Sequence, residues 1–161
     1  ELSSLKHRNG KPLIKLYGPS GTANRGGTFL MNLVDETGQF YPLHHIEELA
    51  ILNKISLRTG CFCNPGIDET NHQLPLQLLS TYFTQHDYGD YYDFVNYLGR
   101  PRGAVRISIG IPTIKKDLHY FFDFAKTLLN KKAPVNPLLI INENSSHFNY
   151  ALNRHKEVFS Q

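Results

Sequence analysis

Two cysteines stand in a short stretch whose composition suits sulfur chemistry. Residues 58–66 read Arg-Thr-Gly-Cys-Phe-Cys-Asn-Pro-Gly, and Cys61 and Cys63 are the 2 cysteines of the chain. The thiolate is the reactive form of cysteine, and a nearby cation such as Arg58 favours it. Glycine and proline around the pair indicate a loop, where reactive side chains are often placed. The alternative is that both cysteines are small buried hydrophobic residues.

Composition limits the classes of protein to consider. The chain has 161 residues, about one domain, and 40% of them are hydrophobic, enough for a core. A net charge of +3 is too small to indicate nucleic-acid binding. We find no apolar run near the roughly 20 residues that span a membrane and no signal peptide. Two cysteines one residue apart are not a secreted disulfide framework, so we expect a cytoplasmic protein.

The first half of the chain predicts three strands and one helix. Alternating or mostly apolar residues predict strands at residues 13–17 and 28–34. Residues 44–53 have apolar side chains at helical spacing, which predicts an amphipathic helix. Residues 55–57 are expected to form a short strand leading into the cysteine loop.

The second half is less regular. Residues 67–102 form an insert, in which clusters of leucine and aromatic residues predict two helices, and its basic end, residues 99–103, is expected to be a solvated turn. Residues 104–109 predict a strand and residues 115–129 a strong amphipathic helix. Residues 131–161 are expected to form a C-terminal extension, a strand and a helix packed on the same domain. This order of elements predicts an α+β fold, with helices covering one face of a small sheet.

Two motifs resemble a known family. Residues 58–66 resemble the cysteine loop of molybdenum cofactor sulfurases, and residues 103–110 (Gly-Ala-Val-Arg-Ile-Ser-Ile-Gly) resemble the strand that follows it. Residues 17–19 (Tyr-Gly-Pro) match the entry to this region in the related cysteine desulfurases, and order and spacing agree over residues 13–129. The resemblance implies that residues 1–130 are the C-terminal small domain of a class V aminotransferase-family enzyme. Such enzymes have the fold type I and use pyridoxal phosphate (PLP).

The resemblance also implies roles for individual residues. Cys63 matches the cysteine that carries a persulfide, and Arg106 matches the arginine that anchors the substrate's α-carboxylate. Arg58 is expected to support the loop or the thiolate, with a structural salt bridge as the alternative. Cys61 is left with three roles: relaying sulfur, pairing with Cys63, or packing.

Cofactor and partners follow from the same resemblance. Family members hold PLP through a lysine in a preceding large domain, so no cofactor is expected on this chain alone. The chain begins at Glu1 without a methionine, and we expect it to be a fragment whose PLP domain lies upstream. The expected partners are that upstream domain, a second copy in a homodimer, and a protein or cofactor that accepts sulfur. Nucleic acid and membranes are not expected partners.

Three alternative functions stay open at this point. The chain could be a non-catalytic sulfur carrier or assembly module, or part of a class V aminotransferase-like enzyme with another amino-acid substrate. A zinc site built from Cys61, Cys63 and a distant histidine is disfavoured, because Cys-x-Cys is not the usual spacing of zinc ligands. We therefore expect no metal.

Overall fold

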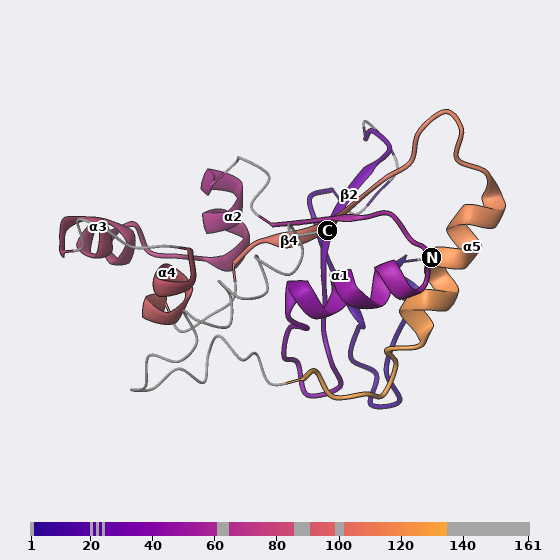
Figure 1. Ribbon diagram of the computed structural model, residues 1–161, viewed down its shortest axis with the longest axis horizontal. Helices are drawn as coiled ribbons and strands as arrows, with labels where there is room; N and C mark the ends of the chain where they lie inside the picture. Colours follow the sequence, from indigo (N-terminus) through magenta and orange to yellow (C-terminus); the bar gives the residue numbers. More distant parts are fainter. Residues whose placement is uncertain are drawn as a thin grey trace, which may run out of the picture.

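A computed structural model of the chain describes residues 2–19, 21, 23, 25–60, 65–85, 91–98 and 102–134. A 3₁₀ turn, η1 (Leu2–Ser4), opens the described chain. Four strands follow in one antiparallel sheet: β1 (Ile14–Tyr17), β2 (Thr28–Leu33), β3 (Arg58–Gly60) and β4 (Ala104–Ser108). Their spatial order is β1-β2-β4-β3, so β2 and β4 are the central strands (Figure 1).

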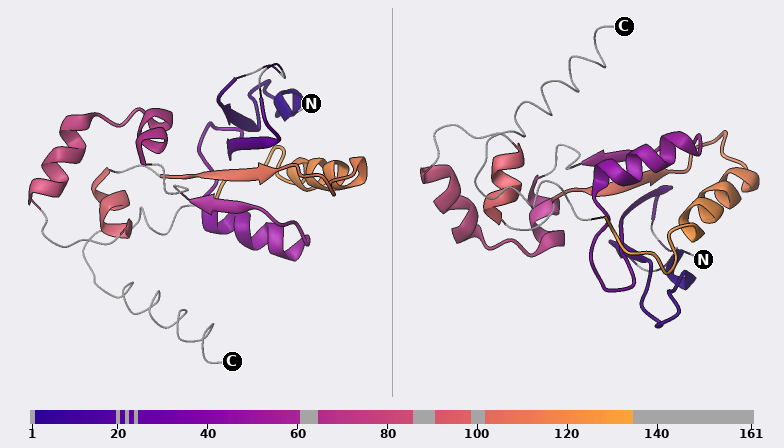
Figure 2. Two further views of the ribbon diagram at one scale, coloured as in Figure 1. Left: turned by 90° about the horizontal axis from the view of Figure 1, so that it is seen from above. Right: turned by 60° about the horizontal axis from the view of Figure 1, so that its bottom comes forward.

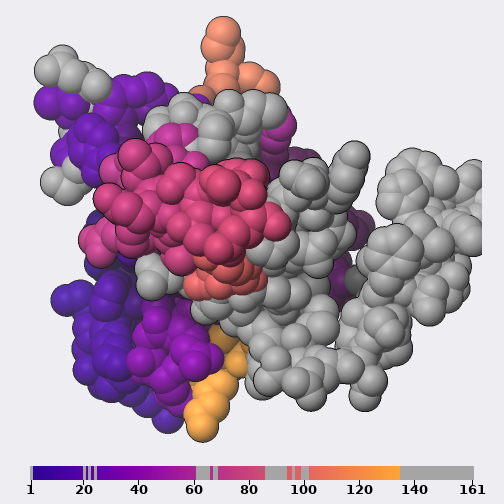
Figure 3. Space-filling view, turned by 90° about the vertical axis from the view of Figure 1, so that its left-hand side faces the viewer, coloured from indigo at the N-terminus to yellow at the C-terminus, as the bar shows by residue number. Residues whose placement is uncertain are grey.

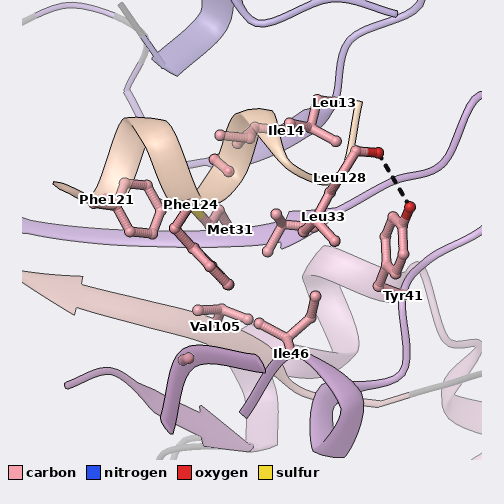
Figure 4. Close-up of a cluster of buried hydrophobic side chains, with 12 residues drawn as sticks. Leu13, Ile14, Met31, Leu33, Tyr41, Ile46, Val105, Phe121, Phe124 and Leu128 are labelled. Atoms are coloured by element: carbon pink, nitrogen blue, oxygen red, sulfur yellow. Dashed lines mark hydrogen bonds between the residues drawn. The ribbon is translucent and has the colours of Figure 1, made fainter. Parts of the chain in front are cut away.

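Two helices cover one face of this sheet, as the sequence predicts. They are α1 (Leu43–Leu52) and α5 (Lys115–Lys126). Side chains alternate between the two faces of a strand, so one face of β2 and β4 carries large apolar residues. Figure 4 shows these side chains meeting side chains from both helices. The core they form contains Leu13, Ile14, Met31, Leu33, Tyr41, Ile46, Ala50, Val105, Phe121, Phe124, Ala125 and Leu128.

The insert forms three helices at one end of the molecule. They are α2 (Pro65–His72), α3 (Leu76–Gln85) and α4 (Tyr91–Leu98). Both views of Figure 2 place α3 and α4 at the end opposite α5, and Figure 3 looks directly at this end. The insert has its own buried cluster, made of Leu74, Leu79, Tyr82, Phe94 and Leu98. The insert therefore adds a second, smaller core to the domain.

The structure corrects the sequence prediction at three elements. The third strand lies at Arg58–Gly60 and not at residues 55–57. The reason is that the Ile55 N–H donates to the Ala50 carbonyl at 2.9 Å, so this segment belongs to the end of α1. Helix α2 was not predicted. Helix α5 ends at Lys126. Beyond it, the N–H groups of Leu128 and Leu129 donate to the carbonyls three residues earlier, which is the tighter 3₁₀ pattern. The strand and helix expected within residues 131–161 fall almost wholly outside the described residues.

A buried carboxylate joins the sheet to the segment after α5. Asp35 is 1% exposed. One of its oxygens accepts from the Thr37 N–H and hydroxyl and from the Gly38 and Gln39 N–H groups at 2.7–2.9 Å. The other accepts from the Ala133 N–H at 2.9 Å. Burial opposes ionisation, but these hydrogen bonds, led by the Thr37 hydroxyl, outweigh it and lower the pKa of Asp35 from 3.8 to about 2.

We predict that Asp35→Asn lowers the free energy of unfolding by about 2 kcal/mol at pH 7. A carboxyl whose pKa is lower in the folded state stabilises above its unfolded pKa, and this stabilisation fades as the pH falls from about 4 towards about 2. The difference in the free energy of unfolding between the unmodified chain and Asp35→Asn should therefore shrink to about half by pH 3. Urea unfolding at pH 7 and at pH 3 measures this difference.

The control for this prediction is Asp123→Asn. Asp123 is 72% exposed and pairs with Lys126 on the surface of α5, so this change should alter stability by less than about 1 kcal/mol. An effect of Asp35→Asn that is the same at pH 7 and pH 3 would contradict the assignment.

Candidate active site

The face of the sheet away from α1 and α5 carries polar and charged residues. Register decides which residues share it: Tyr17 pairs with Leu30, Leu30 with Arg106, and Arg106 with Arg58. Paired residues on adjacent strands project to the same side. These four therefore form one line across all four strands. We call this surface the polar face, and it contains Lys15, Tyr17, Leu30, Asn32, Arg58 and Arg106.

The polar face brings together the two arginines that the sequence singled out. Arg58 is exposed and Arg106 is half-buried, and they are direct cross-strand partners between β3 and β4. Like charges placed opposite each other on neighbouring strands are unfavourable. An anion lowers this cost, and a guanidinium can pair with a carboxylate through two parallel hydrogen bonds. The arrangement is therefore suited to binding a carboxylate.

The cysteine loop connects two described elements of this site. It follows β3, whose first residue is Arg58 and last is Gly60, and it precedes α2, which begins at Pro65. Cys61 and Cys63 themselves lie outside the described residues. Their roles therefore stay predictions, but Arg58 stands five positions before Cys63 on the strand that enters the loop.

A buried polar contact joins α2 to the polar face. The Gly103 carbonyl, directly before β4, lies 3.0 Å from His72 Nε2 and 3.3 Å from Asn32 Nδ2. Because a carbonyl only accepts, both nitrogens donate. His72 is 8% exposed and Asn32 is 2% exposed, so water competes little for these bonds. The end of α2 is thereby fixed against β2 and the start of β4.

Aromatic rings surround this contact. The His72 ring lies 6.3 Å from Tyr17 and 5.9 Å from Phe40, between ring centroids. The Lys15 ammonium lies 5.3 Å from the centroid of each of the Tyr17 and Phe40 rings. A cation is attracted to the face of an aromatic ring, so these contacts hold the ammonium in place. The polar face is therefore cationic at Lys15 as well as at the arginine pair.

Sequence reasoning missed the two residues that bond Gly103. Asn32 carries a usable signal, because a polar residue in the middle of an apolar strand needs a buried partner. His72 carries no comparable signal, because it ends a helix that the sequence pattern does not predict.

The expected solvated turn at residues 99–103 is wrong for Arg102. This residue is 8% exposed, with its guanidinium 4.9 Å from the Phe94 ring centroid and 3.9 Å from the Glu69 carboxylate. Arg102 thus links α2 and α4 of the insert to the start of β4. Arg100 lies outside the described residues.

Metal binding finds no support in the described part of the chain. There, no group of three or more histidine, cysteine or acidic side chains is placed to hold an ion. Cys61 and Cys63 lie outside these residues. Within the same residues, no helix is long and apolar enough to cross a bilayer.

We predict that sulfate stabilises the protein through the arginine pair. Sulfate raises the stability of most proteins by exclusion from their surfaces, so the informative quantity is the difference between variants. At equal ionic strength, replacing chloride by sulfate should raise the melting temperature less in Arg58→Gln and Arg106→Gln than in the unmodified chain. Lys116→Gln, on the exposed surface of α5, is the matched control and should respond as the unmodified chain does. Identical sulfate responses in all four proteins would contradict an anion site on the polar face.

Comparison with known proteins confirms the family resemblance. The chain is 37% identical over 131 residues to a molybdenum cofactor sulfurase of Drosophila mojavensis. The aligned stretch covers 78% of this chain and 17% of that protein. It is 33% identical over 139 residues to molybdenum cofactor sulfurase 3 of Aedes aegypti, covering 84% of this chain and 18% of the relative. A molybdenum cofactor sulfurase of Drosophila yakuba is 33% identical over 148 residues, and the aligned stretch covers 89% of this chain and 19% of that protein.

These relatives are much longer than the chain, which spans less than a fifth of their length. No family model matches the chain. No solved structure matches it either. Sequence similarity over most of its residues nevertheless establishes that this chain is a homologue of a segment of the molybdenum cofactor sulfurases.

Proposed function

We propose that this chain is the C-terminal domain of a PLP-dependent cysteine desulfurase of the molybdenum cofactor sulfurase kind. In this proposal Cys63 carries the persulfide and Arg106 anchors the carboxylate of the substrate L-cysteine. The observation that carries it is the cross-strand pairing of Arg106 with Arg58, the strand residue that leads into the cysteine loop. The names of the relatives support the same class of enzyme.

The proposed reaction is a transfer of sulfur to Cys63. Its thiolate attacks the sulfur of L-cysteine, a sulfur–sulfur bond forms, and the substrate's bond between Cβ and sulfur breaks. The electron pair of that bond stays on Cβ, which takes up a proton and becomes the methyl group of alanine. The products are a persulfide on Cys63 and L-alanine, so the two sulfur atoms each lose one electron and Cβ gains both. Arg58 lowers the cost of keeping Cys63 ionised.

The residues described here do not fit a PLP-holding role. Forming an imine with the cofactor requires a neutral lysine amine. Lys15, the lysine on the polar face, has its ammonium 5.3 Å from the centroids of two aromatic rings, so it is already engaged in cation–π contacts. The arginine pair suits the substrate's carboxylate, and the cofactor would supply the electron sink from elsewhere in the protein.

The proposal includes partners and a location. The PLP-binding domain is placed upstream in the same polypeptide, and the intact protein is placed in the cytoplasm as a homodimer. A protein or the molybdenum cofactor receives the sulfur. Cys61 relays sulfur between Cys63 and that acceptor.

The proposal predicts a distinct effect for each site residue in the complete protein supplied with PLP and L-cysteine. Cys63→Ala should abolish both alanine formation and the added sulfur that mass spectrometry detects on residue 63. Arg106→Lys should raise the KM for cysteine by about 10- to 100-fold, because one ammonium cannot replace a bidentate guanidinium. Arg8→Lys, an exposed site elsewhere, is the matched control.

Two results would replace the proposal with an alternative. Cysteine turnover that persists unchanged in Cys63→Ala would remove the persulfide role and leave a class V enzyme of another kind. A complete protein that binds no PLP would indicate the sulfur-carrier or assembly module.

A further inference from the structure

At Gly103 the start of β4 lies close to the end of β3 and to helix α2. Its φ of +83° is in the left-handed region, which favours glycine. A Cβ at this position would lie 2.9 Å from the Gly60 carbonyl carbon and 3.0 Å from a methyl carbon of Leu43. Any side chain would therefore push β4 away from the end of β3. This close approach brings Gly60, the last residue of β3, against Gly103, the residue directly before β4.

The downstream side of the cysteine loop is tied to the same residue. Helix α2 follows the loop, and its last residue, His72, donates a hydrogen bond to the Gly103 carbonyl at 3.0 Å. Asn32 donates to the same oxygen from β2 at 3.3 Å. Both donors are more than nine-tenths buried, so both bonds are formed away from water. One backbone unit thus fixes both elements that flank residues 61–64.

We propose that His72 and Asn32 are positioning residues for sulfur transfer. Their hydrogen bonds to the Gly103 carbonyl tie α2 and β2 to the residue directly before β4, the strand that carries Arg106. The close approach of Gly103 to Gly60 places the end of β3 against the same residue. The inference rests on the proposed function, because it concerns the placement of the cysteine loop relative to the carboxylate anchor. Neither residue touches the substrate in this scheme. Arg106 binds the substrate through its own strand, so loss of the His72 bond should affect the transfer step and spare substrate binding.

Two substitutions of His72 separate the hydrogen bond from ring packing. His72→Phe keeps an aromatic ring near Tyr17 and Phe40 but removes the donor. His72→Gln removes the ring but places an amide N–H near the position of Nε2. His119→Phe, at an exposed site on α5, is the control for adding an apolar ring.

The experiment compares these variants in the complete protein with PLP and L-cysteine. In His72→Phe we expect kcat for persulfide formation on Cys63 to fall by about tenfold or more, since small misplacements of reacting groups are costly. The KM for cysteine should stay within about twofold. His72→Gln should keep most of the kcat of the unmodified protein, and His119→Phe should have the same kcat and KM as the unmodified protein. Amide hydrogen exchange of the peptide spanning residues 58–72 should be about threefold faster in His72→Phe than in His72→Gln.

Three outcomes would overturn the inference. One is unchanged exchange over residues 58–72 in His72→Phe, which would show that the bond does not hold the flanking elements. Another is an unchanged kcat in His72→Phe despite faster amide exchange over residues 58–72. The third is an equal loss of kcat in His72→Phe and His72→Gln. If the unmodified protein forms no persulfide, the proposed function fails instead, and the exchange measurement still decides whether Gly103 anchors both elements.

Discussion

The structure depends on burying one face of β2 and β4 beneath α1 and α5. Met31, Leu33 and Val105 are almost fully removed from water there, and each fully buried aliphatic side chain contributes about 1.5–3 kcal/mol. Because side chains alternate along a strand, burying this face fixes which residues project from the other. The placement of Arg106 on the polar face is thus a consequence of the core. A slip of one residue in β4 would bury the arginine and expose Val105.

The polar face combines features that oppose stability with features that offset them. Two arginines in register place like charges opposite each other on neighbouring strands, which is a local cost. The Gly103 carbonyl and the buried Asp35 carboxylate supply the opposite contribution, since each collects several donors in a protected place. The Gly103 contact lies directly before β4, the strand that carries Arg106, and gives the arginine pair a fixed frame of the kind a binding site needs.

Sequence patterns predicted the elements better than the way they meet. Alternation revealed β1 and β4, a mostly apolar run revealed β2, and helical spacing revealed α1 and the start of α5. Helix α2 was missed because residues 65–72 include few apolar side chains, so they carry no period to detect. Arg58 was recognised as a cation close to the cysteines in sequence, and Arg106 was recognised from the family resemblance. Their adjacency, and the contacts of His72 and Asn32 with Gly103, depend on a register between distant segments that local sequence does not encode.

The central claim is that the polar face binds the substrate's carboxylate beside the cysteine loop. The most direct measurement is a crystal structure of the complete protein with PLP and an unreactive cysteine analogue. We predict that the analogue's carboxylate pairs with the Arg106 guanidinium on the polar face, with its side chain directed towards Cys63. An analogue bound elsewhere, while a carboxylate of the protein itself occupies Arg106, would contradict the account.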